Sequence, residues 1–246
     1  METLHGIENQ ITILYNKFFK KNKIDLNTGI WNNSKIDREL RFATMPHIGD
    51  NYSSTQIKIL FVGLDIGEDE YDRLQTFDER RNNVSMPNDE FFQKNPHMSG
   101  TYIETLCLLK DYYFNEWTHV HNMRDYQNRS VLLELKDILP INLLRNTAQT
   151  NYYKFVTKGR VNRRQGASDR DHFGISNEIK KLFLDEVEIL NPDIIWFQGN
   201  DFKDYEVFKE LKEKTCKRII NAYHPSSFIK KEFFGEVAKT NTPHYT

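Results

Sequence analysis

The run from Ile57 to Val62 constrains the fold of this chain more than any other stretch. Five of its six residues are apolar, and most of these are β-branched or aromatic. Such a run is typical of a strand that is buried on both faces, as in a parallel sheet covered by helices. Gly63 and Gly67 frame the turn that follows, and Asp65 lies between them. Because open α/β sheets bind ligands at the carboxyl ends of their strands, Asp65 is a carboxylate at the expected place for a site.

The rest of the chain repeats this alternation of buried strands with helices. Apolar residues recur with helical spacing over 7–19, 177–190 and 207–214, and further strands are predicted at about 151–156, 194–197 and 218–222. This order predicts an α/β fold with a parallel sheet covered by helices. Asp65 also has a purely structural interpretation, as the N-cap of the helix after the first strand.

Length and charge set broad limits on the organisation of the protein. A chain of 246 residues is long enough for one large domain or two small ones. We expect a single domain over 1–246, with a core at about 57–228 and an N-terminal helical extension over 1–50. The 34 basic and 35 acidic residues leave a net charge of -1, so the overall charge does not indicate a nucleic-acid partner, although a local basic patch is compatible with it.

The cysteines and the hydropathy pattern narrow the setting. Cys107 and Cys216 are the only cysteines, too few for a four-thiolate zinc site or an iron–sulfur cluster, and we expect both to be buried apolar groups. No apolar run approaches the ~20 residues that a membrane span needs. The first ten residues include charges and no apolar leader region. We therefore expect a cytoplasmic monomer that is not bound to a membrane.

Four short motifs follow one another between Ile57 and Phe228. They are Gly63-Leu64-Asp65-Ile66-Gly67, Thr150-Asn151-Tyr152-Tyr153-Lys154-Phe155, Asn191-Pro192-Asp193-Ile194-Ile195-Trp196-Phe197-Gln198-Gly199 and His224-Pro225-Ser226-Ser227. Their order and spacing resemble the uracil-DNA glycosylase superfamily. The resemblance implies a three-layer α/β/α sandwich around a short four-stranded parallel sheet. It also implies an enzyme without metal or cofactor that hydrolyses the N-glycosidic bond of uracil, or of a related deaminated base, in damaged DNA.

The resemblance assigns catalytic roles to Asp65 and His224. Cleavage of the glycosidic bond builds positive charge on the sugar, and a carboxylate stabilises that charge and orients the attacking water. Asp65 is expected to do this. Negative charge collects on the departing base, where a hydrogen-bond donor such as His224 stabilises it as an oxyanion hole does. His224 also has a structural interpretation, as a surface or core histidine before a proline turn.

The base-binding set that the resemblance implies comes from three segments: Gly63, Leu64, Gly67, His97 and Asn151. Asn151, expected at the start of a strand, offers both an acceptor and a donor to a pyrimidine edge, although a turn asparagine at a strand edge explains it equally well. The aromatic residue that stacks on the base is not assigned uniquely. His97 fits best by its distance from Gly100, and Phe77 and Phe92 are alternatives.

Contacts to DNA are expected from two segments. Ser226 and Ser227 are suited to hold a phosphate through hydroxyl and backbone N–H groups. Phe228 occupies the place of the family's intercalating side chain, where an apolar wedge fills the gap left by a flipped base, but it is equally suited to a core. The loop after the second motif carries basic residues that would meet phosphates or simply form a solvated face: Lys158, Arg160, Arg163 and Arg164.

The chain departs from the family pattern in the first motif. Ile66 stands where the family usually has Pro, and Gly67 holds the place of the Tyr that excludes the thymine methyl group in strict uracil enzymes. Narrow uracil specificity is therefore not expected. The nearby histidines His119 and His121 have no acidic or thiol partner at ligand spacing, and we interpret them as structural.

Two other functions fit part of this pattern. A nucleic-acid or nucleotide-binding protein on the same fold, without catalysis, agrees with the near-neutral charge and with Ile66. A different α/β hydrolase that uses Asp65 as an acid or base explains the first motif but leaves the other three unexplained.

Overall fold

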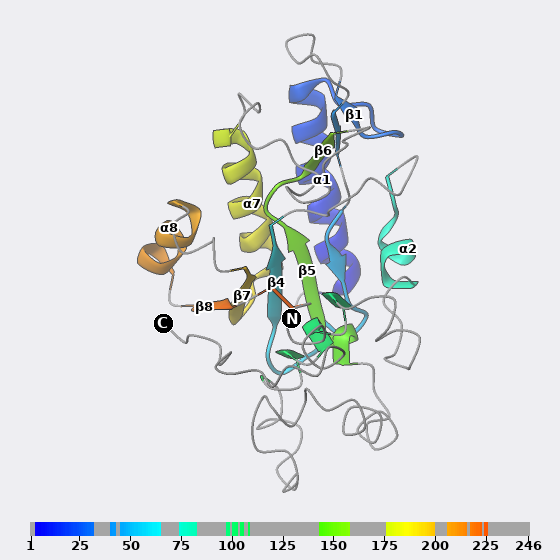
Figure 1. The fold of residues 1–246 in the computed structure, drawn as a ribbon. Helices are drawn as coiled ribbons and strands as arrows, with labels where there is room; N and C mark the ends of the chain where they lie inside the picture. The colour runs from blue at the N-terminus through cyan, green and yellow to red at the C-terminus, as the bar shows by residue number, and fades with distance from the viewer. Residues whose placement is uncertain are drawn as a thin grey trace, which may run out of the picture.

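A computed structural model describes the parts of the chain on which the fold rests. These are residues 3–31, 40–42, 45–64, 74–82, 97–98, 100–102, 104–105, 108, 143–157, 176–199, 206–215, 217–222 and 224–225. A mixed sheet with helices packed on it forms the centre of this part of the molecule (Figure 1). The predicted α/β class is thus confirmed.

The central sheet has five strands in the order β3-β5-β4-β7-β8. Their bounds are β3 (His47–Ile48), β5 (Thr147–Asn151), β4 (Ile59–Gly63), β7 (Ile194–Gln198) and β8 (Arg218–Ala222). The last four strands of this order are mutually parallel, and β3 pairs with β5 in the antiparallel sense. The carboxyl ends of four strands therefore meet at one edge. The antiparallel β3 was not predicted, because two residues are too few to show a periodic pattern.

Burial on both faces explains why β4 and β7 are continuous apolar runs. All five residues of each strand are buried. Successive side chains point to opposite faces: Leu60 and Val62 pack on the side of α1 (Leu4–Asn22) and α7 (Ser176–Leu190), whereas Phe61 packs with Trp196 and Leu108 on the other side. The predicted strands at 194–197 and 218–222 are confirmed, and the first predicted strand is confirmed as β4.

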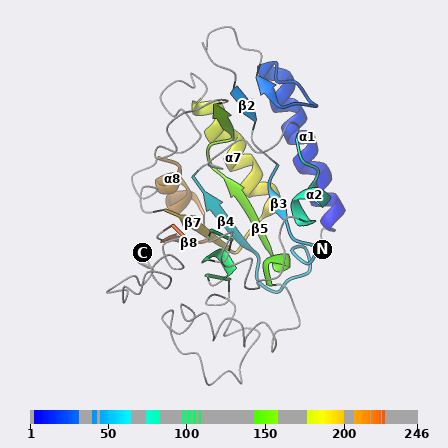
Figure 2. The same ribbon diagram turned by 45° about the vertical axis from the view of Figure 1, so that its right-hand side comes forward.

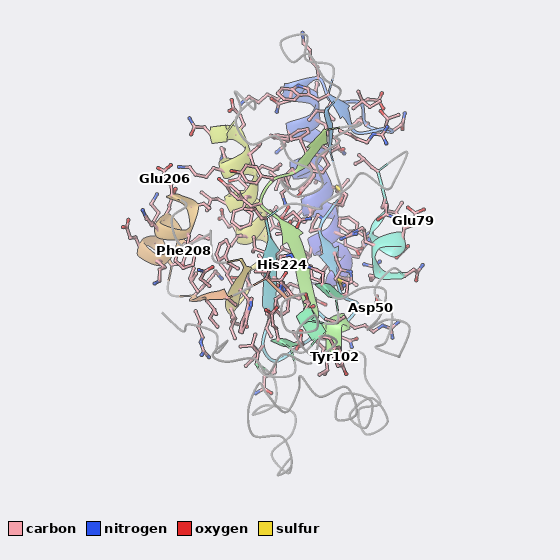
Figure 3. The ribbon with its side chains drawn as sticks, viewed as in Figure 1. Asp50, Glu79, Tyr102, Glu206, Phe208 and His224 are labelled. Carbon is pink, nitrogen blue, oxygen red and sulfur yellow. The ribbon has the colours of Figure 1, made fainter. Side chains whose placement is uncertain are left out.

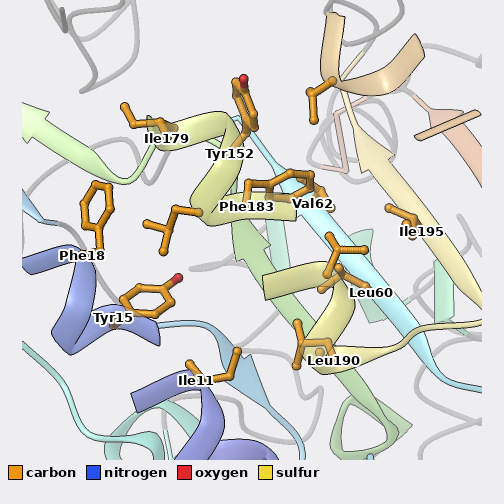
Figure 4. Packing of buried hydrophobic residues seen from close by; sticks show 14 of the residues in the cluster. Ile11, Tyr15, Phe18, Leu60, Val62, Tyr152, Ile179, Phe183, Leu190 and Ile195 are labelled. Carbon is orange, nitrogen blue, oxygen red and sulfur yellow. The ribbon is translucent and has the colours of Figure 1, made fainter. Parts of the chain in front are cut away.

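The three helices that the apolar spacing predicted cover one face of the sheet. They are α1, α7 and α8 (Glu206–Lys214), and their buried residues share a single core cluster with β4. The helices α1 and α7 pack side by side (Figure 2), and Figure 4 shows how their apolar residues meet. The Thr3 hydroxyl accepts a hydrogen bond from the Gly6 N–H at the start of α1, and Lys23 ends it in the left-handed conformation.

The helix α1, expected to form an N-terminal extension, packs directly against α7. The assignment of the whole chain to one domain stays a prediction. Two shorter elements flank the sheet: α2 (Phe77–Asn82) packs beside β3, and a 3₁₀ helix at Leu143–Asn146 leads into β5. Within the described residues, no helix is long and apolar enough to cross a membrane.

The bounds of the second predicted strand were wrong. Instead of starting a strand, Asn151 ends β5, and the chain turns before β6 (Phe155–Thr157). The strand β6 joins a separate antiparallel sheet with β2 (Leu40–Phe42) and β1 (Ile30–Trp31). The sequence Thr-Ala-Gln-Thr-Asn of β5 has no large apolar residue, so its pattern does not mark it as a core strand. It is buried because it lies between β3 and β4.

Candidate functional site

The carboxyl edge of the sheet brings the described parts of all four motifs together. Gly63 ends β4 beside Asn151, which ends β5. Gln198 ends β7 opposite Ala222 at the end of β8, and His224 follows two residues later (Figure 3). Segments far apart in the sequence thus deliver polar side chains to the edge where parallel sheets bind ligands.

Strand pleating also puts these positions on one face. Phe61, Trp196 and Ala222 pack in the cluster that contains Leu108, on the side opposite α1 and α7. Side chains two residues apart share a face, so Gln198 lies on this side as well, and so does Gly63 with its neighbour Asn151. The described residues of 97–108 are helical and pack against this face.

Asn151 lies directly against Gly63. A Cβ atom added to Gly63 would be 2.4 Å from the Oδ1 atom of Asn151, so the amide occupies the space that the glycine leaves open. The backbone ties the two strand ends together, because the Tyr152 N–H donates to the Gly63 carbonyl and the Tyr153 N–H donates to the Leu64 carbonyl, both at 2.9 Å. The amide of Asn151 is thus held at the carboxyl edge of the sheet.

His97 and His224 form a close pair at the same edge. Nδ1 of His97 lies 3.4 Å from Nε2 of His224, and the ring centroids are 5.0 Å apart. Burial, together with the positive charge of His224, lowers the pKa of His97 to about 3. At neutral pH the His97 ring is therefore uncharged, with one nitrogen to donate and one to accept a hydrogen bond. His224, by contrast, is exposed.

A glycine contact brings the two histidines together. A Cβ atom on Gly100 would be 2.3 Å from the carbonyl oxygen of Pro225, so only a residue without a side chain lets the helical segment lie on the turn after His224. The segment is also bonded to the sheet, because the amide of Gln198 donates to the Thr101 hydroxyl at 2.8 Å. The Thr101 hydroxyl in turn donates to the His97 carbonyl at 3.0 Å.

A buried carboxyl group lies beneath this contact. The Gln198 amide also donates to Oε2 of Glu104 at 2.8 Å, and Glu104 has no exposed surface. Burial raises the pKa of Glu104 to about 8, against the opposing effect of the hydrogen bond from Gln198. Glu104 is therefore mostly protonated at neutral pH. Sequence reasoning missed Glu104, Thr101 and Gln198; the only signal was that a polar Gln198 ends an apolar run.

The other predicted site residues fall into two groups. Leu64 is half-buried, and its side chain packs against the main core cluster, as does that of Phe77 in α2. The rest lie outside the described residues: Asp65, Gly67, Phe92, Lys158, Arg160, Arg163, Arg164, Ser226, Ser227 and Phe228. Of the predicted base-binding and catalytic set, the described structure therefore brings together Gly63, Asn151, His97 and His224.

In the part of the chain that the structure describes, no group of three or more His, Cys, Asp or Glu side chains could hold a metal ion. The histidines His119 and His121 and the cysteines Cys107 and Cys216 lie outside that part. Comparison with models of protein families, with curated proteins and with solved structures gave no match.

Proposed function

We propose that the protein is a DNA glycosylase that removes uracil or a related deaminated base. One observation carries the proposal: the first, second and fourth motifs supply Gly63, Asn151 and His224 to one edge of a parallel sheet. Motifs at different edges of the sheet could not have formed one site, and the resemblance would then have implied no common function for them. Their position at one edge of the sheet supports a common site for a base and its sugar.

In the proposed reaction the damaged base leaves the duplex stack and enters the site, at a cost of roughly a few kcal/mol. The bond between the base nitrogen and C1′ of the sugar breaks, and its electron pair goes to the base. A water molecule then forms a bond to C1′ and loses a proton. Asp65, which comes two residues after the end of β4, is the carboxylate that orients this water and stabilises the sugar cation.

His224 supplies the hydrogen bond that stabilises the departing base. Its contact with His97, at 3.4 Å between Nδ1 of His97 and Nε2 of His224, keeps the ring at the edge of the sheet. Because His97 is neutral, this contact places no positive charge beside His224. The anionic base takes up its proton from solvent, so the products are the free base and an abasic site.

The test is base release from labelled oligonucleotides that carry a single uracil, hypoxanthine or xanthine, single- or double-stranded, followed by alkaline cleavage of abasic sites. We expect product with the natural protein and its loss in Asp65→Asn, with a drop of about 10²–10³-fold in His224→Ala. Asp185→Asn is the matched control, because Asp185 pairs with exposed Lys181 on α7.

Absence of product on every lesion at high protein concentration would overturn the enzymatic proposal. Binding of the same oligonucleotides, measured by fluorescence anisotropy, would then favour the second candidate, a binding protein on this fold. The departure at Ile66, which stands beside the proposed catalytic carboxylate where the family usually has Pro, favours that candidate.

A further inference from the structure

A fully buried ion pair lies directly behind the proposed base-reading residue. Lys154 and Glu186 expose 2% and 0% of their side chains, and Nζ of Lys154 is 3.0 Å from Oε2 and 3.2 Å from Oε1 of Glu186. Nζ also donates to the Thr150 hydroxyl at 2.5 Å. The Tyr15 hydroxyl donates to Oε2 of Glu186. We call Tyr15, Thr150, Lys154 and Glu186 the buried clamp.

The clamp satisfies its own hydrogen-bonding groups. The ammonium group of Lys154 has an acceptor for each of its three hydrogens, and both oxygens of Glu186 receive hydrogen bonds. Burial lowers the pKa of Lys154, but Glu186 opposes this effect and favours the charged form. Such a pair contributes little net stability compared with apolar residues, and its geometry is restricted because a displaced charge loses the partners that compensate its burial. A role in specifying conformation is therefore a better account than stability.

The conformation that the clamp specifies is that of Asn151. The bond between Lys154 and Thr150 closes the turn of the chain in which Asn151 lies, immediately after Thr150. On one side, this turn is bonded to the carbonyl groups of Gly63 and Leu64. On the other side, Glu186 anchors it to α7 and Tyr15 anchors it to α1.

The clamp does not itself face the proposed base. Thr150 pairs with Val62, whose side chain belongs to the core on the α1 and α7 side of the sheet. Asn151, the next residue, points to the opposite face because side chains alternate along a strand. Lys154 therefore acts on the site only through the backbone that carries Asn151.

We propose that Lys154 is a positioning residue: through the buried clamp it fixes the Asn151 amide over Gly63 and thereby sets which base the site accepts. The consequence for base choice rests on the proposed glycosylase function. The placement of Asn151 does not, since it is a property of the free protein. Two separate measurements therefore test the two statements.

Two variants, the triple variant and Thr150→Val, separate positioning from folding. Lys154→Met alone leaves Glu186 charged and buried without its partner, which strongly destabilises a fold. The triple variant Tyr15→Phe, Lys154→Met and Glu186→Leu removes the ion pair and the Tyr15 hydroxyl with similar volume, leaves the Thr150 hydroxyl in place, and is expected to fold. Thr150→Val removes only the hydroxyl next to Asn151, and valine suits a strand. Lys181→Met is the control, because it removes an exposed ion pair on α7.

The first measurement is the ¹H–¹⁵N NMR signal pair of the Asn151 side-chain amide, assigned by its loss in Asn151→Ala. We expect one well-dispersed pair in the natural protein and in Lys181→Met. In the triple variant the pair should move toward the shifts of a free amide, with a smaller movement in Thr150→Val. Unchanged signals in both Thr150→Val and the triple variant would overturn the proposal.

The second measurement is the ratio of kcat/KM for the two bases that the natural protein removes fastest. This ratio does not depend on the fraction of folded enzyme, so a merely structural role leaves it constant. We expect it to change by about tenfold or more in the triple variant, because a displacement of about 1 Å in a site costs up to about 10²-fold. A constant ratio alongside a displaced amide would overturn the link to base choice. If the natural protein removes no base, the proposed function fails and the NMR result alone decides the role of Lys154.

Discussion

Replacement of Gly63 by alanine tests the site through a single interatomic contact. The added Cβ would lie 2.4 Å from Oδ1 of Asn151, while its distances to Cγ of Asn151 and to the Thr150 carbonyl oxygen, 3.6 and 3.8 Å, are ordinary contacts. Ordinary contact begins at 3.4 Å, so the difference, 3.4 − 2.4, requires Oδ1 to retreat by 1.0 Å. Among the described residues beyond its chain neighbours, no other atom needs to move.

Stability and activity should therefore respond in opposite ways. Gly63 is not among the glycines with left-handed φ, so alanine fits its backbone and stabilises the strand by about 0.5–1 kcal/mol through the unfolded state. The cost of rotating the Asn151 side-chain amide away from the new Cβ atom offsets part of this gain in stability. We expect the melting temperature to stay within a few degrees or to rise. A displacement of about 1 Å in the amide should lower kcat/KM for base release by about 10- to 100-fold.

A double-mutant cycle with Asn151→Ala shows whether the effect passes through this contact. With the amide removed, Gly63→Ala has nothing to displace, so it should cause no further loss of kcat/KM beyond Asn151→Ala itself. Activity is measured on oligonucleotides and stability by thermal unfolding. Additive losses in the double variant, or full activity in Gly63→Ala, would refute the role of the contact.

Three more predictions concern the described residues of the helical segment at 97–108, which pack on this face of the sheet. Gly100→Ala puts its Cβ 2.3 Å from the backbone of Pro225, which cannot rotate away, so we expect both a lower melting temperature and lower activity; a variant as stable as the natural protein would contradict this contact. Glu104 has a pKa raised from 4.5 to about 8, so the folded state holds its proton while the unfolded state releases it, and stability falls as pH rises between these values. Urea unfolding should show up to roughly 4 kcal/mol of loss from pH 5 to pH 8 that Glu104→Gln removes, and an equal pH dependence in the variant would count against the buried carboxyl. The ring of His97, with a pKa lowered to about 3, should keep constant ¹H–¹³C NMR shifts from pH 5 to pH 8, and a midpoint near 6.5 would show that it is not desolvated.

Apolar periodicity predicted the elements that bury large side chains. The strands β4, β7 and β8 and the helices α1, α7 and α8 all carry enough Ile, Leu, Phe or Trp to show their period. The strand β5 carries Thr, Ala and Gln instead, and it is a strand because its neighbours pair with it on both sides. Tertiary pairing overrides local preference there, which is why Asn151 was expected at the wrong end of a strand.

The family resemblance, rather than the strand pattern, pointed to His224 and Asn151. Of the two, only His224 was expected after a strand, and the parallel strands β5 and β8 bring both residues to one edge of the sheet. The contact between His97 and His224 was not predictable, because it depends on how closely the helical segment approaches Pro225. Gln198 was missed because a polar residue that ends a strand usually meets water, whereas here it is 3% exposed and bonded to Glu104.

The packing of α1 on α7 has a consequence for synthesis on the ribosome. The helix α1 rests on a helix that is synthesised much later: Tyr15 and its partner Glu186 are 171 residues apart. At about 5–20 residues per second, the nascent chain waits roughly 10–30 s between the two. During that interval Phe42 can already pack on Tyr15 and Phe19, but the part of the apolar stripe that faces α7 lacks its native cover. The order of translation thus makes completion of the core a late event. Until α7 is synthesised, the apolar residues of α1 that pack on it depend on other contacts to keep them from water.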